Sequence, residues 1–552
     1  MDVEGRKKLD MQEMDEKMSV NIVEANTVQQ GITSARLQSL SGVLRRSARR
    51  HGDKTALICG DVQWSYTQFD RLVDRLARGL KAAGISPGDR IAILARNSHA
   101  FLALRFAIAR ADAVLVPINF MLNPSDVQYI LEHSGARFMF VDRSTLAVAE
   151  KAAPSSLERL LGIPGEVDPA PDELVSWESF FGDDGPVVET RGGDDLLQII
   201  YTSGTESRPK GAMLSHNSVL WQYQSVILDC EWTTDTVALH SMPLFHCAQL
   251  DNMFGPAVQV GATNIVTGMP TAENICDLLK RYDITSYFAP PTIWISLLRA
   301  PGRVKGDLPS LVKGYYGASI MPVEILRELQ AWLPDLRLWN LYGQTEIAPL
   351  ATVLFPEEHA HHLGSAGRPV LNVETRIVDD EMADVSPGEI GEIVHRSPQL
   401  LTGYWNDPER TAEAFKGGWF HSGDLALMDD AGYITVVDRK KDMIKSGGEN
   451  VSSREVEEAL YLHPGVSEVA VIGLPDAKWI EAVTAVVVVK SGHAVSEADI
   501  MAHCSRHLST FKAPKNVHFR ESLPRNASGK ILKRELREEL ASANREAVWT
   551  VQ

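Results

Sequence analysis

Strand-like and helix-like segments alternate along the chain from about residue 37 onward, and this pattern restricts the fold more than any other feature. Apolar runs at 91–94, 114–116 and 138–141 indicate buried strands, whereas 98–111 and 125–133 have the apolar spacing of helices. Parallel neighbouring strands are joined by a crossover, usually a helix. The alternation therefore predicts an α/β fold in which parallel sheets are covered by helices.

Another helix is expected just before the first of these strands. Its apolar residues recur every three or four positions, and Gly84 and Pro87 end it. Thr67, followed three residues later by Asp70, is a candidate capping box, which places the N-cap of this helix at Thr67.

The chain has 552 residues, which is too long for one ordinary domain. The pattern changes near Asp438, where alternating charges follow a strand-like segment. Beyond that point the chain has its own helices at 454–461 and 497–508, and strands at 468–472 and 482–490. We therefore expect a disordered extension over 1–35, a large N-terminal domain over 36–437 and a small α+β domain over 438–552.

The overall charge restricts the partners. The 72 acidic and 55 basic residues give a formal charge of −17, which argues against nucleic acid or an anionic membrane as the main partner. The most apolar stretch contains Arg105, Arg110 and Asp112, so no transmembrane segment is predicted. No apolar segment of a secretory signal follows the first basic residues. The five cysteines lack metal-ligand spacing, which is typical of reduced thiols in a cytoplasmic protein.

The first chemical signal is the segment Tyr201–Gly211, which follows an apolar strand-like run. Its hydroxyl groups and its lysine can bind phosphate oxygens, and its glycine lets backbone N–H groups approach closely. The segment is not a Walker A loop, because Pro209 stands where glycine is required and Gly211 follows the lysine. By itself it indicates either an anion site or an ordinary polar turn.

Other segments carry matching chemistry. Residues 340–346 offer an aromatic ring, a hydroxyl and a carboxylate, which suit adenine stacking and Mg²⁺ coordination. Asp424 lies in an apolar-flanked turn, where its carboxylate can accept both ribose hydroxyls. Residues 438–450 combine cations with a double glycine, and Lys530 follows a turn of Asn, Ser and Gly. Together they suggest ATP chemistry on a carboxylic acid.

In this order, these segments resemble the adenylate-forming superfamily, which includes acyl-CoA synthetases, nonribosomal-peptide adenylation domains and firefly luciferase. The resemblance runs from about residue 40 to 540. It implies a large N-terminal domain of two parallel-type sheets with a β-barrel-like subdomain, and a small mobile C-terminal lid. It also implies ATP and coenzyme A as substrates and Mg²⁺ as cofactor.

The resemblance assigns roles to individual residues. The positions that contact the β- and γ-phosphates are Thr202, Ser203, Gly204, Thr205 and Lys210. The positions around adenine and the acyl group are Gly317, Ala318, Ser319, Tyr342 and Gly343. Thr345 corresponds to the α-phosphate contact, Glu346 with Thr202 to the Mg²⁺ ligands, and Asp424 with Arg439 to the ribose contacts.

The resemblance also implies a reaction in two steps. Lys530 corresponds to the lysine that bridges the carboxylate, the ribose and the α-phosphate during adenylation, and His246 to an aromatic gate beside the acyl pocket. Lys441 corresponds to the hinge about which the lid rotates before the thiol of coenzyme A attacks. The positions that line the pantetheine tunnel are Lys445, Ser446, Gly447, Gly448 and Glu449.

The acid is harder to identify. No cation is evident in 245–254 or 289–294 to pair with a second substrate charge, which favours an apolar monocarboxylic acid. We expect a medium- or long-chain fatty acid, with an aryl or bulky natural-product acid as the alternative. A carrier-protein phosphopantetheine is the alternative acceptor to free coenzyme A. A homodimer is compatible with the sequence.

One departure from the superfamily pattern affects the phosphate segment. Glu206-Ser207 stands where Thr-Gly is usual, and a carboxylate repels polyphosphate unless it is paired. An ion pair with Arg208 would neutralise it. The departure keeps open a homologue that binds an acyl ligand without activating it.

Overall fold

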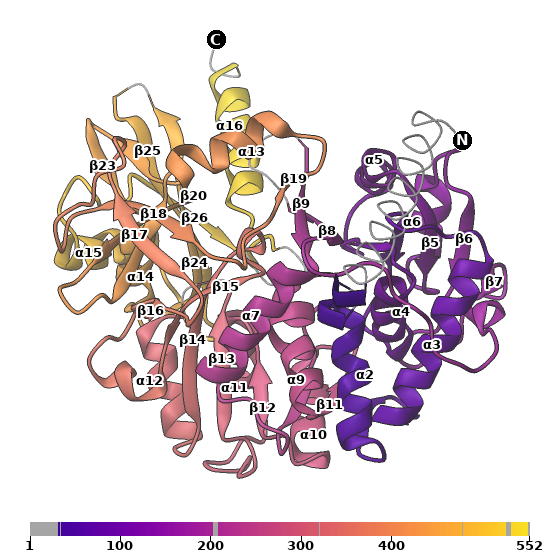
Figure 1. Cartoon of the computed structure of the whole chain (residues 1–552). Coiled ribbons are helices and arrows are strands. Elements are labelled where there is room, and N and C mark those ends of the chain that lie inside the picture. The colour runs from indigo at the N-terminus through magenta and orange to yellow at the C-terminus, as the bar shows by residue number, and fades with distance from the viewer. Residues whose placement is uncertain are drawn as a thin grey trace, which may run out of the picture.

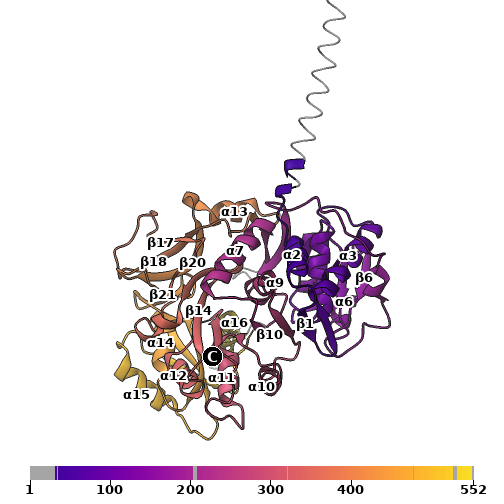
Figure 2. The ribbon, with the colours of Figure 1, turned by 60° about the horizontal axis from the view of Figure 1, so that its bottom comes forward.

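The computed structural model describes residues 31–33, 35–202, 208–319, 321–476, 478–525 and 531–549. Figure 1 shows two large sheets with their helices, and two smaller sheets above and to one side of them. Figure 2 shows helices α14 Ser453–Tyr461 and α15 Glu497–His507, with the smaller sheet of residues 374–439, on the side away from α3 Tyr66–Ala82 and β6 Arg159–Gly162. The chain is thus a mixed α/β protein with a large N-terminal part and a smaller C-terminal domain.

The first sheet has eight strands in the order β19-β9-β8-β4-β3-β5-β6-β7. Its strands are β3 Arg90–Leu94, β4 Val114–Pro117, β5 Ala136–Val141, β6 Arg159–Gly162, β7 Val175–Ser176, β8 Leu196–Thr202, β9 Lys210–Ser215 and β19 Gly403–Tyr404. Strands β3 to β8 pair in parallel, whereas β9 and β19 add antiparallel strands at one edge. The predicted parallel arrangement of the first three strands is confirmed.

The second sheet has nine strands in the order β16-β15-β14-β13-β12-β10-β11-β1-β2. They are β1 Thr55–Cys59, β2 Val62–Ser65, β10 Val237–His240, β11 Thr263–Val266, β12 Ser286–Phe288, β13 Lys313–Gly317, β14 Arg337–Gly343, β15 Leu350–Leu354 and β16 Arg368–Pro369. Its central strands are parallel, and its two ends are antiparallel.

The helices of these two layers cover the sheets. Those of the first half are α2 Leu40–His51, α3 Tyr66–Ala82, α4 His99–Arg110, α5 Pro124–Ser134, α6 Leu146–Ala152 and the 3₁₀ helix η1 Trp177–Phe180. Those of the second half are α7 His216–Asp229, α8 Cys247–Gln249, α9 Gly255–Val260, α10 Ala272–Arg281, α11 Pro291–Arg299 and α12 Val323–Trp332. A π-helix, η2 Leu250–Phe254, joins α8 to α9, and 3₁₀ helices occur at η3 Thr345–Ile347 and η4 Pro356–Ala360.

Two smaller antiparallel-type sheets complete the chain. The third sheet consists of β17 Glu374–Val378, β18 Gly391–Arg396, β20 Phe420–Met428 and β21 Ile434–Arg439, with α13 Pro408–Ala414 and η5 Lys416–Gly418 nearby in the chain. The fourth contains β22 Ile444–Ser446, β23 Glu449–Val451, β24 Val466–Asp476, β25 Ile480–Val489 and β26 Asn516–Arg520. It is joined by α14 Ser453–Tyr461, α15 Glu497–His507 and α16 Lys533–Trp549. The predicted boundary at Asp438 falls inside β21, and the domain limits stay a prediction.

The core between the two large sheets is built around α4. Every residue of this helix is buried, and it shares one apolar cluster with Leu57 of β1 and Ile93 of β3. The charges that interrupt its apolar sequence are paired: Arg105 contacts Asp251, and Arg110 contacts Asp70 and Asp74. Among the described residues, no helix is long and apolar enough to cross a membrane.

The predicted capping box of α3 is wrong by two residues. Ser65, not Thr67, is the N-cap: its hydroxyl accepts from Gln68 N at 3.2 Å, and Gln68 Oε1 accepts from Ser65 N at 2.8 Å. The helix begins earlier because Tyr66 is fully buried and its hydroxyl donates to Ala262 O at 2.6 Å. A tertiary contact thus decides between two similar local signals.

Candidate active site

A cavity of about 530 Å³ is lined by residues from the first three sheets. The predicted site residues in its lining are Thr202, Lys210, His246, Ala318, Tyr342, Gly343, Thr345, Glu346, Asp424, Arg439 and Lys441. They come from β8, β9, β14, β20 and β21, and from the segments that follow β10, β13, β14 and β21. Chain folding therefore brings together segments that are more than two hundred residues apart in the sequence.

Lys210 and Glu346 meet at one tyrosine hydroxyl. Lys210 Nζ donates to Tyr404 Oη at 2.7 Å, and Tyr404 Oη donates to Glu346 Oε1 at 3.0 Å. The ammonium group lies 3.5 Å from the Glu346 carboxylate and 4.2 Å from the centre of the tyrosine ring. Glu346 is only 6% exposed, so this hydroxyl holds a buried carboxylate and a cation in a fixed arrangement.

Sequence analysis missed Tyr404. It lies in β19, and the antiparallel pairing of Tyr404 with Ala212 of β9 carries it to Lys210. Burial, and then the Glu346 charge, raise the pKa of the Tyr404 phenol far above its ordinary value, so the hydroxyl stays protonated and can donate. A lone tyrosine after a glycine gives no signal of this role in the sequence.

A second group lies where β14, β20 and β21 approach one another. Tyr342 Oη donates to Asp424 Oδ2 at 2.7 Å, and Arg439 Nε lies 3.3 Å from Asp424 Oδ1. The register of β20 with β21 places Asp424 opposite Arg439. Burial and the Asp424 charge raise the pKa of Tyr342, which keeps its hydroxyl a donor. The carboxylate that was predicted to accept ribose hydroxyls is thus held in place by an aromatic ring and a cation.

His246 and Thr345 lie on another wall of the same cavity. His246 caps α8, and its Nδ1 accepts from Ala248 N at 3.1 Å. Cys247 Sγ lies 3.4 Å from Thr345 Oγ1. Burial raises the pKa of the Cys247 thiol to about 12, so this thiol is a neutral packing group and not a nucleophile.

Thr202 and Glu346 together suit Mg²⁺. Thr202 Oγ1 is buried and has no hydrogen-bond partner among the described residues. The β8–β9 register places Thr202 opposite Lys210, and Glu346 supplies a carboxylate to the same cavity. Because Mg²⁺ is usually held by one or two carboxylates together with substrate phosphates, a single carboxylate and one hydroxyl fit this ion.

Some residues of the predicted site lie outside the described part of the chain, and close packing accounts for one glycine that is described. Ser203, Gly204, Thr205, Glu206 and Lys530 lie outside the described residues. Gly317 packs against β14, where a Cβ would overlap the Leu341 carbonyl oxygen. The Arg208 guanidinium lines the cavity and lies 5.1 Å from the centre of the Tyr129 ring.

A second cavity, of about 410 Å³, separates the C-terminal domain from the end of the second sheet. The residues that line both cavities are Ala318, Leu341, Tyr342, Gly343, Asp424, Arg439 and Lys441. Ser319 also lines the second cavity, as do Arg525 and Ile531, the described residues on either side of the predicted Lys530 turn. The two cavities are therefore adjacent, and the C-terminal domain faces the residues that are predicted to bind the nucleotide.

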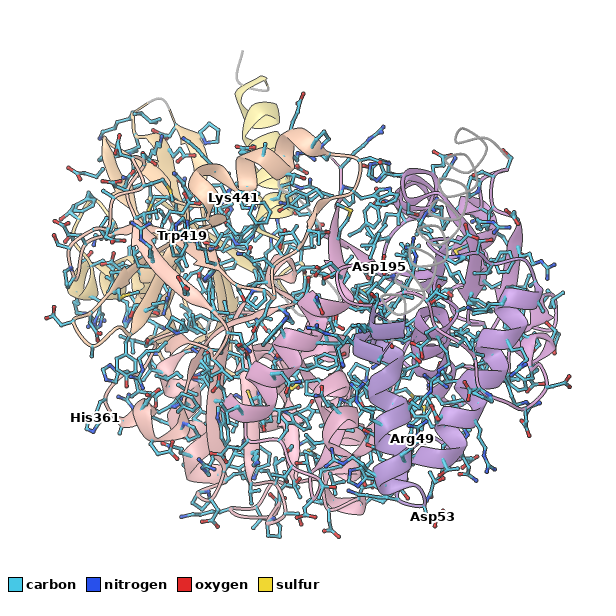
Figure 3. The ribbon with its side chains drawn as sticks, viewed as in Figure 1. Arg49, Asp53, Asp195, His361, Trp419 and Lys441 are labelled. Carbon is cyan, nitrogen blue, oxygen red and sulfur yellow. The ribbon has the colours of Figure 1, made fainter. Side chains whose placement is uncertain are left out.

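Lys441 lies at this junction and is labelled in Figure 3. Partial burial, and then the nearby Arg439, lower the pKa of Lys441 to about 8. Its neighbour Asp442 contacts Arg537 of α16 at 2.7 Å. The predicted hinge thus contains a lysine whose charge changes close to neutral pH.

The predicted tunnel residues lie in the β22–β23 hairpin and do not line either cavity. Both turn glycines have positive φ, 63° at Gly447 and 92° at Gly448, which suits a two-residue hairpin turn. A Cβ on Gly448 would meet no atom within 4 Å, whereas one on Gly447 would lie 3.1 Å from the Trp479 ring. The hairpin turn by itself accounts for both glycines, and their role in a pantetheine tunnel stays a prediction.

Two family models match the chain: "AMP-binding enzyme" over residues 44–405, and "AMP-binding enzyme C-terminal domain" over residues 455–530. The chain belongs to the AMP-binding enzyme family. This membership confirms the resemblance to the adenylate-forming superfamily, and its relatives identify an AMP-forming acid–CoA ligase.

Relatives of this AMP-binding enzyme span nearly its whole length. A feruloyl-CoA synthase of Amycolatopsis is 39% identical over 504 residues, which cover 91% of this chain and 99% of the relative. A long-chain-fatty-acid–CoA ligase of Mycobacterium tuberculosis is 36% identical over 487 residues, covering 87% and 94%. The structure of an anthranilate CoA ligase in complex with anthranoyl-AMP superposes with a TM-score of 0.85 at 26% identity, covering 92% and 98%.

Proposed function

We propose that this AMP-binding enzyme activates an apolar monocarboxylic acid as its acyl adenylate, releases pyrophosphate and transfers the acyl group to free coenzyme A. One observation carries the proposal: a single cavity joins a carboxylate held with a lysine, Glu346 and Lys210, to the pair Asp424 and Arg439. Apolar residues, among them Leu341 and Leu350, line the same cavity.

Each polar group of the cavity has a proposed role in the first step, the formation of the acyl adenylate. Asp424 accepts the ribose hydroxyls, since Tyr342 and Arg439 orient its carboxylate. Lys210, with Ser203, Gly204 and Thr205, binds the β- and γ-phosphates, and Thr345 contacts the α-phosphate. Mg²⁺, when bound by Glu346 and Thr202, supplies further positive charge beside the phosphates.

The acid then reacts at the α-phosphorus. A carboxylate oxygen attacks, the bond to the bridging oxygen breaks, and pyrophosphate leaves with the electron pair. Lys530 and Lys210 offset the negative charge that gathers in this in-line transition state. His246 stands beside the acyl group and controls access to it.

The second step uses coenzyme A. We propose that the C-terminal domain rotates about Lys441 and that Gly447 and Gly448 then line the pantetheine path. The thiolate attacks the acyl carbonyl, and AMP leaves. A free thiol has a pKa of about 8.5, so enough thiolate forms without a protein base.

Two classes of acid are candidates. The 39% identical feruloyl-CoA synthase supports an aryl acid, the alternative from the sequence. The 36% identical long-chain-fatty-acid–CoA ligase supports the fatty acid that the sequence first suggested. Since the aryl relative is the more similar of the two and matches more of the chain, we favour the aryl acid.

The test is pyrophosphate release over a panel of carboxylic acids, in which aryl acids and straight-chain fatty acids of several lengths are compared. Each acid is assayed with coenzyme A and with a phosphopantetheine-bearing carrier protein. We expect pyrophosphate release and a thioester with coenzyme A for aryl acids. Release of pyrophosphate with none of the acids would support the non-catalytic homologue instead.

A further inference from the structure

A group of aromatic side chains joins α5 to β8. Tyr129 and His133 lie one turn apart on α5 and stack, with their ring centres 5.3 Å apart and their planes at 23°. His133 Nδ1 lies 2.8 Å from Tyr201 Oη of β8, and Trp405 Nε1 donates to His133 O at 3.0 Å. Tyr129, Tyr201 and Trp405 also pack against one apolar cluster. Residues from three parts of the chain therefore fix the place of the Tyr129 ring.

The charge states in this group follow from burial. Partial burial lowers the pKa of His133 below its ordinary value of 6.5, so its ring is uncharged at neutral pH. Burial raises the pKa of Tyr201, whose hydroxyl therefore stays protonated and donates to His133 Nδ1. A neutral His133 does not repel a cation that lies beside Tyr129.

The Arg208 guanidinium is the cation that this ring meets. Its central carbon lies 5.1 Å from the centre of the Tyr129 ring, within the range of a cation–π contact. Arg208 also lines the first cavity, two residues before Lys210 in the chain. No hydrogen bond or ion pair joins its side chain to another residue in the described part of the chain. An aromatic ring binds a guanidinium without using its five N–H donors, so these stay available to an anion.

We propose that Tyr129 is a positioning residue, which holds the Arg208 guanidinium at the cavity wall so that it binds the β- and γ-phosphates of ATP and then the leaving pyrophosphate. This inference rests on the proposed CoA-ligase function. Arginine suits the place better than lysine, because its planar group both lies on an aromatic ring and matches two phosphate oxygens at once. The sequence suggested a different role for Arg208, the pairing with Glu206, and the two roles predict different behaviour of variants.

The role is confined to the first half-reaction. ATP and pyrophosphate carry the phosphates that Arg208 contacts, whereas the acyl adenylate keeps only the α-phosphate. Loss of Arg208 should therefore weaken the use of ATP, and of pyrophosphate in the reverse direction. Thioester formation from a supplied acyl adenylate should be unchanged, which would not be so if the change disturbed the fold.

Four single variants separate the ring from the charge. Arg208→Ala should lower kcat/KM for ATP by roughly tenfold, because charge-assisted hydrogen bonds are lost from a solvent-exposed side chain. Tyr129→Leu should lower it by roughly three- to fivefold, whereas Tyr129→Phe keeps the ring and should stay within about twofold of the unchanged enzyme. Arg208→Lys keeps the charge without the planar group and should recover only part of the alanine loss.

A double variant decides whether Tyr129 acts through Arg208. If it does, Tyr129→Leu has no further effect once Arg208 is replaced by alanine, so the two losses are not additive. Arg368→Ala is the matched control, because Arg368 also lies over a tyrosine ring, 4.9 Å from the centre of Tyr433, but outside both cavities. This control should leave kcat/KM for ATP unchanged.

Three assays supply the measurements. Pyrophosphate release is followed with ATP varied at saturating acid, and acid-dependent pyrophosphate exchange with pyrophosphate varied. The third assay is thioester formation from a supplied acyl adenylate and coenzyme A. We expect Arg208→Ala and Tyr129→Leu to raise KM for ATP and for pyrophosphate, and to leave the third assay unchanged.

The outcomes distinguish the inference from the proposed function. A matching fall in thioester formation, or additive losses in the double variant, would overturn the role of Tyr129 and leave the ligase function standing. Rescue of Arg208→Ala by Glu206→Thr, with no effect of Tyr129→Leu, would assign the arginine to Glu206 instead and overturn the inference as well. Absence of pyrophosphate release by the unchanged enzyme with every acid would overturn the proposed function, and this inference with it.

Discussion

Replacing Tyr404 with phenylalanine tests whether the hydroxyl that joins Lys210 to Glu346 organises the proposed phosphate-binding site. The change removes one oxygen atom and leaves the ring under the Lys210 ammonium group. Without that oxygen, the cation, now 3.5 Å from the Glu346 carboxylate, can close on it directly. ATP and Mg²⁺ would then have to break a tighter ion pair before they bind.

The expected magnitude follows from the two hydrogen bonds. A hydrogen bond to a charged group contributes about 1.5–3 kcal/mol, and removing its partner from a buried group leaves the full desolvation cost. Glu346 is nearly buried, but the Lys210 side chain is 27% exposed, so water replaces part of what is lost there. We therefore use about 2 kcal/mol, which corresponds to a fall of roughly 30-fold in kcat/KM for ATP.

The assay is pyrophosphate release at saturating acid, with ATP varied at several Mg²⁺ concentrations. Most of the loss should be seen as a higher KM for ATP. Tyr433→Phe is the matched control, because Tyr433 Oη also donates to a carboxylate, Glu358 at 2.8 Å, but lies outside both cavities. Equal kcat/KM values for the two variants would refute the role assigned to Tyr404.

Three further predictions concern the C-terminal part of the chain. Lys530→Ala should reduce adenylate formation by several orders of magnitude and leave thioester formation from a supplied acyl adenylate largely intact; equal losses in both half-reactions would contradict its assignment to the first step. Gly448→Trp should block thioester formation while acid-dependent pyrophosphate exchange continues. Gly492→Trp is the control for backbone strain, because Gly492 also has a positive φ and open space around it. If Gly448→Trp abolishes exchange as well, Gly448 serves folding or ATP binding. The pKa of Lys441 is lowered to about 8 from 10.5, so between these pH values the folded state binds fewer protons than the unfolded state. The contribution of Lys441 to the free energy of unfolding should therefore rise with pH in this window and be constant below it. Thermal unfolding of Lys441→Met against the unchanged protein from pH 7 to 10.5 measures this, and parallel curves would show that Lys441 is not perturbed.

Local patterns were sufficient for much of the fold. The strands at β3, β4 and β5 and the helices α4 and α5 lie within one or two residues of the predicted ranges, because apolar periodicity reports which face of each element is buried. The start of α3 was misplaced because Thr67–Asp70 and Ser65–Gln68 carry nearly the same local signal, and the burial of Tyr66 chooses between them. Such a choice depends on residues far away in the chain and cannot be read locally.

The site residues also fall into those that the sequence predicted and those that only the folded structure reveals. Residues such as Thr202, Glu346 and Asp424 stand in short segments whose residue types already suit phosphate, Mg²⁺ and ribose, so the sequence alone indicated ATP chemistry on a carboxylic acid. Tyr404 lies in a segment without such a pattern. Tyr404 acquires its position from the pairing of β19 with β9. The sequence by itself determined the fold class and the reaction, because both depend on residue types at fixed spacings. Only the tertiary structure decided which side chains support the site, since their hydrogen-bond partners come together only when the chain folds.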